Sequence, residues 1–322
     1  MLYTLRKKAI GTSHSKIILI GEHSVVYGKP AIALPFPTLN VTTTIEETGR
    51  PVYVKTELYA GPLHKVPEKM KGIVACLKEA AKELGEKLTG FSMKIDSNIP
   101  LGRGLGSSAA IAIACVRALF KYFGHDLPRE TLMRLVHIAE TYAHGNPSGI
   151  DMEAASSANP IWFQKGQNTE TVKLGTSFYL IVADTGRIGD TRAAVDGIKQ
   201  KYEVDPVRTG ASIDLLETYT YQVREALLNG DIPLVGTLLN AAQDELTKLG
   251  VSDETIEHLV NEARKAGAYG AKLTGGGRGG CIIALTDTLQ KAKELSYTLL
   301  EKGATNTWYV RVSENYGSLA VL

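Results

Sequence analysis

Cysteine is scarce in this chain, and no two cysteines are spaced as a metal or redox motif. The 322 residues include three cysteines, Cys76, Cys115 and Cys281, with no Cys-x-x-Cys pair. Such a set argues against a disulfide framework and against a structural zinc site, and it fits a reducing compartment. The N-terminal segment also lacks the apolar stretch of a secretory signal. We therefore expect a cytoplasmic protein with buried, unreactive thiols.

The sequence has neither an excess of one charge nor a long hydrophobic run. Lys and Arg number 36 against 34 Asp and Glu, so the formal net charge is only +2. Nucleic-acid binding normally requires a basic face, so we expect no nucleic-acid partner. The longest apolar run, residues 109–116, is far too short to cross a bilayer. We expect no membrane partner either.

The length favours two domains, and the residue pattern suggests where they divide. The first half contains both predicted strands and predicted helices. The strands are at 16–20, 39–45, 52–56 and 91–96, and the helices are at 69–84, 107–123 and 128–143. The second half has strands at 178–183, 281–285 and 306–312 and helices at 209–228, 232–249, 253–266 and 289–302. A polar stretch at 166–175 separates the halves. We expect domains 1–175 and 176–322, the second with two helices on an antiparallel sheet.

A glycine-rich loop at residues 100–110 (PLGRGLGSSAA) joins a predicted strand to a predicted helix. Gly102, Gly104 and Gly106 allow backbone N–H groups to turn toward a ligand, and the helix start adds unsatisfied donors. Together these features favour a phosphate site. The loop lacks the Gly-Lys-Ser/Thr ending of a Walker A motif. A plain glycine turn with Ser107 as the helix N-cap remains the alternative.

Two acidic residues stand out around the string HGNPSGID at residues 144–151, one before it and one at its end. Glu140 lies near the end of a predicted helix, where the helix dipole disfavours a carboxylate unless a cation lies beside it. Asp151 follows the turn and begins a short helical stretch. The alternative is that Asp151 is an N-cap and Glu140 a solvated surface residue.

A third cluster surrounds the apolar strand at residues 16–20. Lys16 opens this strand, and Glu22 and His23 lie in the turn that follows it. Charged residues at both ends of a buried strand indicate a function. The alternative is a strand-edge lysine followed by a solvated turn, with His23 in a structural role.

The strings KIILIGEHSVVYG, PLGRGLGSSAA, HGNPSGID and KLTGGGRGGC resemble the ordered motifs of the GHMP kinases, and among them most closely those of the mevalonate kinases. They extend from about residue 13 to residue 281, which is nearly the whole chain. Galactokinases would carry an acidic residue after the Gly-Glu-His turn, and the related decarboxylases would lack Lys16. Ser13 and His14 depart from the Ala-Pro that relatives often carry there, which affects only the strand entry.

The resemblance implies an α+β fold of two GHMP domains. The first would be a mixed α/β domain and the second ferredoxin-like, with the active site in the cleft between them. It implies ATP-dependent phosphorylation of the 5-hydroxyl of mevalonate, with ATP and Mg²⁺ as cofactors. The only partner it implies is a small-molecule substrate. The sequence does not show the oligomeric state, for which a homodimer is the commonest choice among soluble proteins.

The resemblance also implies individual roles. Asp151 would be the catalytic base, with Lys16 beside it to stabilise the developing alkoxide, and Ser108 and Glu140 would hold Mg²⁺. Gly275, Gly276 and Gly277 would close over the triphosphate or over the surroundings of the base. Nucleotide contacts would come from Pro100, Gly102, Gly104, Leu105, Gly106, Ser107, Ser108 and Ala109. Substrate contacts would come from Glu22, His23, Thr191 and Gly276.

Two other readings of the sequence stay open. One is a GHMP kinase that acts on phosphomevalonate, galactose or homoserine. The other is a silent member that binds nucleotide as a sensor, which we expect to lose Lys16, Glu140 or Asp151. All three residues are present.

Overall fold

The protein's structure, a computed structural model, describes residues 7–145 and 147–313, which fall into two compact units. Of the described residues, the first unit contains 7–15, 39–99 and 106–156, and the second contains 16–38, 100–105 and 157–313. Strands β1 (Lys8–Ile20) and β2 (Ala31–Pro51) each supply residues to both. These units are groups of residues in contact, and each contains several separate segments of the chain. They do not test the predicted domains 1–175 and 176–322, which stay a prediction.

The first unit is built on a mixed sheet. Its strands follow the order β4 (Ala60–Pro62), β3 (Tyr53–Lys55), β5 (Thr89–Ser97) and β2, and β1 also pairs with β2. Strand β5 is antiparallel to β2 and parallel to β3. Phe91, Met93 and Ile95 of β5 are buried while their neighbours are more exposed, which confirms the predicted half-buried strand.

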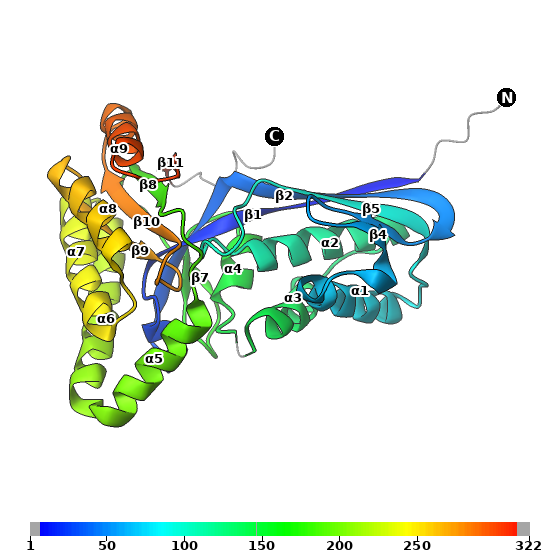
Figure 1. Ribbon diagram of the computed structural model, residues 1–322, viewed down its shortest axis with the longest axis horizontal. Coiled ribbons are helices and arrows are strands. Elements are labelled where there is room, and N and C mark those ends of the chain that lie inside the picture. The colour runs from blue at the N-terminus through cyan, green and yellow to red at the C-terminus, as the bar shows by residue number, and fades with distance from the viewer. Residues whose placement is uncertain (1–6, 146, 314–322) are drawn as a thin grey trace. The chain divides into compact units, whose positions relative to one another are not determined.

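Helices cover one face of this sheet (Figure 1). They are α1 (Lys71–Leu84), α2 (Ser107–Phe123), α3 (Arg129–His144) and α4 (Ile150–Ser156), with 3₁₀ turns η2 (Leu63–Lys65) and η3 (Glu68–Met70). A Cβ on Gly11 of β1 would lie 2.3 Å from the carbonyl oxygen of Ala114. Only glycine therefore allows α2 to approach the sheet this closely.

The second unit contains a four-stranded antiparallel sheet. Its order is β11 (Asn306–Val312), β8 (Phe178–Asp184), β10 (Cys281–Thr286) and β9 (Gly270–Thr274). The register places Cys281 opposite both Asp184 and Thr274. The same unit also contains η1 (Ser24–Tyr27), β6 (Ile161–Phe163) and β7 (Glu170–Thr171), and residues 31–33 of β2 pair with β6.

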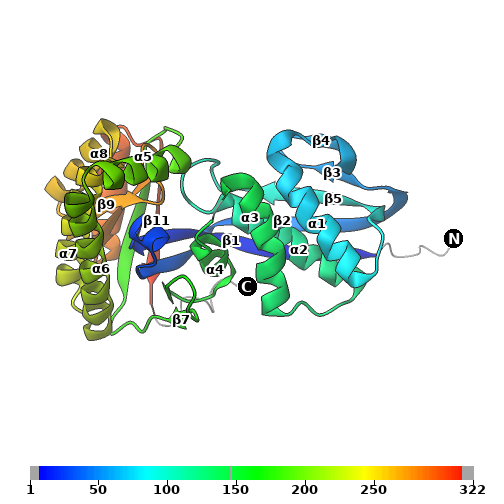
Figure 2. The same cartoon turned by 90° about the horizontal axis from the view of Figure 1, so that it is seen from below.

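Helices line this second sheet (Figure 2). The helices of this unit are α5 (Thr191–Val204), α6 (Pro206–Asn229), α7 (Ile232–Leu249), α8 (Glu254–Lys265) and α9 (Leu289–Glu301), and α6 packs on α5 and α7. Helix α7 packs on β9, α8 on β9 and β10, and α9 on β8, β10 and β11. More helices contact the sheet than the two that we expected.

Strand β9 is an edge strand of this sheet. Side-chain amides of α7 accept hydrogen bonds from the backbone N–H groups on its unpaired edge. The Ala271 N–H donates to Asn240 Oδ1 at 3.0 Å, and the Leu273 N–H donates to Gln243 Oε1 at 2.9 Å. Asn240 and Gln243 lie one helical turn apart, and alternate residues of a strand present their N–H groups on the same edge. This edge is therefore paired within the unit and held in position.

Several elements differ from the prediction, among them the following. Strand β1 begins at Lys8 instead of residue 16, because Ala9, Gly11 and Ser13 alternate inward but are too small or polar to read as a strand. Strand β2 continues through residues 49–51, where we expected a break. Helix α5 was not predicted, although the Asp190 side chain accepts from the Ala193 N–H at 2.9 Å as an N-cap.

Candidate active site

The glycine-rich loop leads into α2 with an unsatisfied helix start. Gly102, Gly104 and Gly106 have φ of 70°, 76° and 72°, a region that glycine adopts at little cost. Gly106 occupies the N-cap position, so no side chain caps α2. The Ser107 hydroxyl is buried and has no hydrogen-bond partner among the described residues. The alternative that Ser107 caps the helix is therefore wrong, and the helix start is suited to an anion.

A second glycine segment, residues 275–280, lies against the first part of this loop. A Cβ on Gly275 would lie 2.9 Å from the Cα of Gly104. A Cβ on Gly104 would lie 3.2 Å from the carbonyl oxygen of Thr274. The Gly189 N–H donates to the Gly102 carbonyl at 2.8 Å. The backbones of the two segments lie so close together that side chains would not fit between them. The closure of residues 275–277 over a triphosphate stays a prediction.

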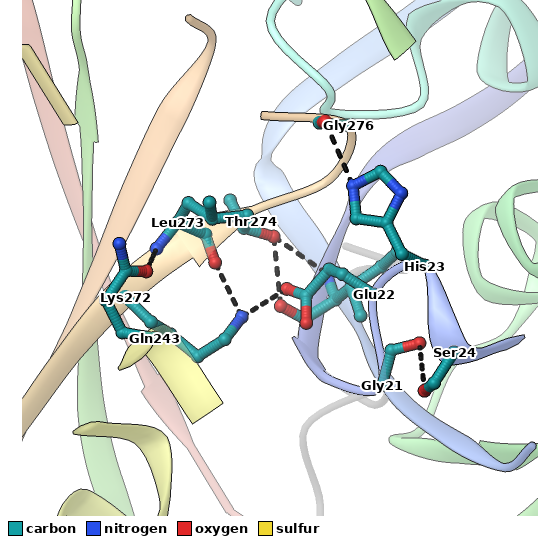
Figure 3. Close-up of polar contacts among 10 residues, drawn as sticks. Gly21, Glu22, His23, Ser24, Gln243, Lys272, Leu273, Thr274 and Gly276 are labelled. Atoms are coloured by element: carbon teal, nitrogen blue, oxygen red, sulfur yellow. Dashed lines mark hydrogen bonds and ion pairs between the residues drawn. The ribbon is translucent and has the colours of Figure 1, made fainter. Parts of the chain in front are cut away.

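The turn after β1 contains a buried ion pair that joins it to β9 (Figure 3). Glu22 and Lys272 are 1% and 0% exposed, and the Lys272 ammonium donates to Glu22 Oε1. Burial raises the pKa of the Glu22 carboxyl, and the Lys272 charge opposes that shift. Burial likewise lowers the pKa of Lys272, and the negative charge of Glu22 opposes this shift. Each residue supplies the countercharge that the other needs in an apolar interior.

His23 is buried beside this pair, and its ring is held by the second glycine segment. Its Nε2 lies 3.0 Å from the Gly276 carbonyl oxygen, which can only accept, so Nε2 carries the proton. Burial lowers the pKa of His23 to about 4, against the opposing effect of this hydrogen bond. Thr191 also lies against Gly276, since a Cβ there would be 2.2 Å from Thr191 Oγ1. The four predicted substrate residues, Glu22, His23, Thr191 and Gly276, are thus neighbours.

Lys16 is 2% exposed despite its charge. Its backbone N–H donates to the Leu105 carbonyl of the glycine-rich loop at 3.1 Å. Its ammonium is close enough to Glu22 to lower the pKa of that carboxyl. The second unit therefore brings together Lys16, the Gly-Glu-His turn and the first part of the glycine-rich loop. The readings of Lys16 as a strand-edge residue and of the turn as solvated are wrong.

The other predicted residues lie in the first unit, on three helices that pack against one another. Ser108 lies in the first turn of α2 and is half-buried. Glu140 of α3 is only 2% exposed, so the reading of a solvated carboxylate is wrong. Asp151 is half-buried and lies within the first turn of α4, not at an N-cap. Asn146 of the HGNPSGID string lies outside the described residues.

A magnesium ion would need few protein ligands at this site. Among the described residues, no group of three or more His, Cys, Asp and Glu side chains could hold a metal ion. Ser108 and Glu140 would provide hard oxygen atoms, and phosphate oxygens and water would complete the shell, as is usual for Mg²⁺. The buried Ser107 hydroxyl next to Ser108 fits such a phosphate. The residues present are therefore compatible with a nucleotide-bound Mg²⁺.

Sequence reasoning missed three charged residues around the loops. Lys272 stands inside the quoted string KLTGGGRGGC, but in a fully buried strand where a lysine is unexpected. Arg103 of the glycine-rich loop forms an ion pair with Asp184 at the end of β8. The signal for Lys272 and Asp184 was a charge within or at the end of an apolar strand, and nothing in the sequence indicated their partners.

The described helices include none long and apolar enough to cross a membrane.

Comparison with known families matches both halves of the chain. The family model "GHMP kinases N terminal domain" matches residues 71–158, and "GHMP kinases C terminal" matches residues 223–305. Curated relatives include a mevalonate kinase of Thermococcus sibiricus, 34% identical, with 88% of this chain and 90% of the relative covered. Another, from Aeropyrum pernix, is 32% identical, with 87% and 89% covered.

Solved structures agree with these matches. The crystal structure of L. major mevalonate kinase in complex with R-mevalonate has a TM-score of 0.82 at 27% identity and covers 95% of each chain. Mevalonate kinase from methicillin-resistant Staphylococcus aureus has a TM-score of 0.71 at 32% identity, with 97% of this chain and 99% of that chain covered. The two-domain fold expected from the motifs is confirmed, and the chain belongs to the GHMP kinase family.

Proposed function

We propose that this chain transfers the γ-phosphoryl group of ATP to the 5-hydroxyl of mevalonate. The observation that carries the proposal is the start of α2, where left-handed glycines precede a buried Ser107 hydroxyl that lacks a partner among the described residues. Family membership implies a kinase that uses ATP. The acceptor is supported by relatives named mevalonate kinase and by the fold shared with the mevalonate-bound L. major enzyme.

The nucleotide phosphates would bind along residues 102–108 through backbone N–H groups, with Ser107 as an added donor. Residues 275–277 would contribute from the second glycine segment. Ser108 and Glu140 would hold Mg²⁺, which when bound neutralises charge on the phosphates. The remaining nucleotide contacts of Pro100, Leu105 and Ala109 are proposed on the family motif.

A cavity of about 410 Å³ in the first unit is our candidate for the adenine base. It is lined partly by residues 55–57. Ser97 and Asn98 also line it, and they lie just before the glycine-rich loop. The polar lining offers donors and acceptors for the ring nitrogens of the base.

Phosphoryl transfer depends on in-line positioning and cancellation of charge more than on covalent help from the protein. Asp151 would accept the proton of the acceptor hydroxyl as it attacks the γ-phosphorus. Lys16 would stabilise the oxygen while it carries negative charge. Glu22, His23, Thr191 and Gly276 would hold the rest of the acceptor. A cytoplasmic location and a homodimer complete the proposal.

The experiment that tests the proposal is coupled detection of ADP release with purified protein, ATP and Mg²⁺. Four acceptors are compared at equal concentration: mevalonate, phosphomevalonate, galactose and homoserine. We expect turnover with mevalonate and at most a trace with the other three. Turnover with another acceptor and none with mevalonate would reassign the substrate within the family. ADP release with none of the four would favour the silent sensor.

A further inference from the structure

Lys272 is a lysine with no access to solvent. It lies in β9, is 0% exposed and makes two polar contacts, one to the Glu22 carboxylate and one to the Leu273 carbonyl oxygen at 2.5 Å. Burying an ammonium is strongly unfavourable unless a countercharge compensates. An apolar side chain would fill this position at lower cost, so stability alone does not explain a lysine here.

The ion pair belongs to a series of contacts along β9 and the loop after it (Figure 3). Thr274 Oγ1 accepts from the Ile18 N–H at 3.1 Å and donates to the Ile18 carbonyl at 2.9 Å. The Gly276 carbonyl accepts from the His23 ring at 3.0 Å. Lys272 and Thr274 are alternate residues of β9, so their side chains face the same side of the strand, and Gly276 lies in the turn that follows it. All three residues contact the segment that runs from the end of β1 through the Gly-Glu-His turn.

The turn that they hold has a strained backbone. His23 has a φ of 61° and a ψ of −44°, a sparsely populated conformation that costs a residue other than glycine about 1–3 kcal/mol. Strain of this kind persists only where the surroundings enforce it, and it concentrates at functional sites. The contacts of Glu22 and His23 with β9 and its loop provide that enforcement. The Glu22 Oε2 atom is buried and has no hydrogen-bond partner among the described residues, so it can still accept one.

We infer that Lys272 is a positioning residue for the acceptor: it holds the Glu22 carboxylate ionised and in place, so that Oε2 can accept a hydrogen bond from an acceptor hydroxyl. This inference rests on the proposed function, in which Glu22 and His23 contact the acceptor. Lys272 acts through Glu22 and does not itself touch the reacting atoms. A purely structural ion pair would instead affect folding without affecting one substrate more than the other.

The variants Lys272→Met, Glu22→Gln and the double variant test this inference. Methionine keeps the unbranched shape without the charge. We expect Lys272→Met to raise the KM for mevalonate by about tenfold or more, with a change of less than about threefold in the KM for ATP. Lys265→Met is the matched control, because Lys265 lies at 73% exposure in a surface pair and should leave both constants unchanged.

The double variant separates positioning from structure. If Lys272 acts only through Glu22, the double variant and Glu22→Gln have the same KM for mevalonate. Circular dichroism and thermal unfolding confirm that each variant is folded. If Lys272→Met does not fold, the comparison of the double variant with Glu22→Gln still decides, because neither contains an unpaired buried carboxylate. A further rise in KM in the double variant would overturn the inference, as would an unchanged mevalonate KM in folded Lys272→Met.

The pH dependence of kcat/KM for mevalonate gives an independent readout. The charged groups acting on Glu22 are Lys272 and Lys16, and those acting on neighbouring His23 are Lys272 and Arg278. Removing the Lys272 ammonium raises the pKa of Glu22, so the acid limb of the profile should move to higher pH in Lys272→Met. An unmoved limb would contradict the inference. Wild-type protein that does not phosphorylate mevalonate would instead contradict the proposed function, and the KM comparison is then made with whichever alcohol is turned over.

Discussion

The Arg103 Nε atom lies 2.8 and 3.0 Å from the two carboxylate oxygens of Asp184. Asp184 is 2% exposed at the end of β8, and its carboxylate also accepts from the Gly186 N–H at 2.8 Å. Arg103 donates in addition to the Gly186 carbonyl at 3.1 Å. One side chain of the glycine-rich loop is thus fastened to the sheet of the second unit. A loop of glycines would otherwise lose much conformational entropy on binding a ligand.

Replacing Arg103 by alanine should destabilise the chain by about 2 kcal/mol or more, because it leaves the Asp184 charge buried without its partner. Equilibrium unfolding in urea measures the loss. The control is Lys8→Ala, which removes a pair with side chains 53% and 49% exposed and should cost less than about 1 kcal/mol. Equal losses of unfolding free energy in the two variants would show that the buried pair contributes no more to stability than the exposed pair.

Asp151→Asn should reduce kcat by about 10²- to 10⁴-fold, because loss of a general base typically has that effect. Nucleotide affinity, measured by titration calorimetry, should change little. Asp126→Asn changes an exposed carboxylate in the loop before α3 and serves as the control. Retention of most of the wild-type turnover by Asp151→Asn would remove Asp151 from the chemistry.

Glu140→Gln should shift the Mg²⁺ dependence of turnover to higher metal concentration, because it removes a charged oxygen ligand. The measurement is the rate as a function of free Mg²⁺ at fixed ATP. Glu130→Gln on the same helix, at an exposed position, should give the wild-type curve. An identical curve for Glu140→Gln would place Glu140 outside the metal site.

His23 should make the protein less stable in acid. Its pKa is about 4 in the folded chain, below the ordinary histidine pKa of 6.5, so the unfolded chain binds more protons between these two pH values. The free energy of unfolding should therefore fall as the pH decreases from about 6.5 to about 4, by about 3 kcal/mol in total. Unfolding in urea at a series of pH values measures this slope.

His23→Asn should remove that part of the slope, since asparagine does not titrate and adopts positive φ more readily than most residues. The exposed residue His125, changed to Asn, should leave the slope intact. If His23→Asn and the wild type lose stability in parallel, protonation of His23 does not drive the acid effect.

The three thiols should be unreactive in the folded protein. Cys76, Cys115 and Cys281 are all buried, and burial raises the pKa of each, that of Cys115 to about 12. Thiolates are the reactive form, so Ellman's reagent should label none of them quickly under native conditions and all three in denaturant. Rapid labelling of the native protein would contradict the predicted role as small buried hydrophobic residues.

Local signals predicted most of the elements. The helix at 107–123 matches α2, because apolar residues follow a glycine-rich loop and stop at Gly124, which has a φ of 82°. Helix α7 likewise begins and ends where expected, at residues 232 and 249. Elements were missed where the signal was not apolar periodicity, as in the first half of β1, whose buried residues are small.

The candidate site shows a different limit. The motif strings named Glu22 and His23, but not the ion pair and hydrogen bond that hold them. Lys272 lies 250 residues from Glu22, and no local pattern encodes a contact at such a separation. Burial excluded several of the alternative readings that the sequence had left open. The sequence alone could not tell whether the Glu140 carboxylate is solvated, and the structure shows that it is buried. The sequence thus names candidates, and packing shows which of them are held in place.

The central claim is that the chain phosphorylates the primary alcohol of mevalonate, and the most direct test is ³¹P NMR of the product formed from ATP and mevalonate. We expect, beside ADP, one new phosphate ester whose phosphorus couples to the two protons of a CH₂ group, as only the 5-phosphate would. A phosphate ester without that coupling would mean transfer to another oxygen. No new ester, with ATP intact, would contradict the account.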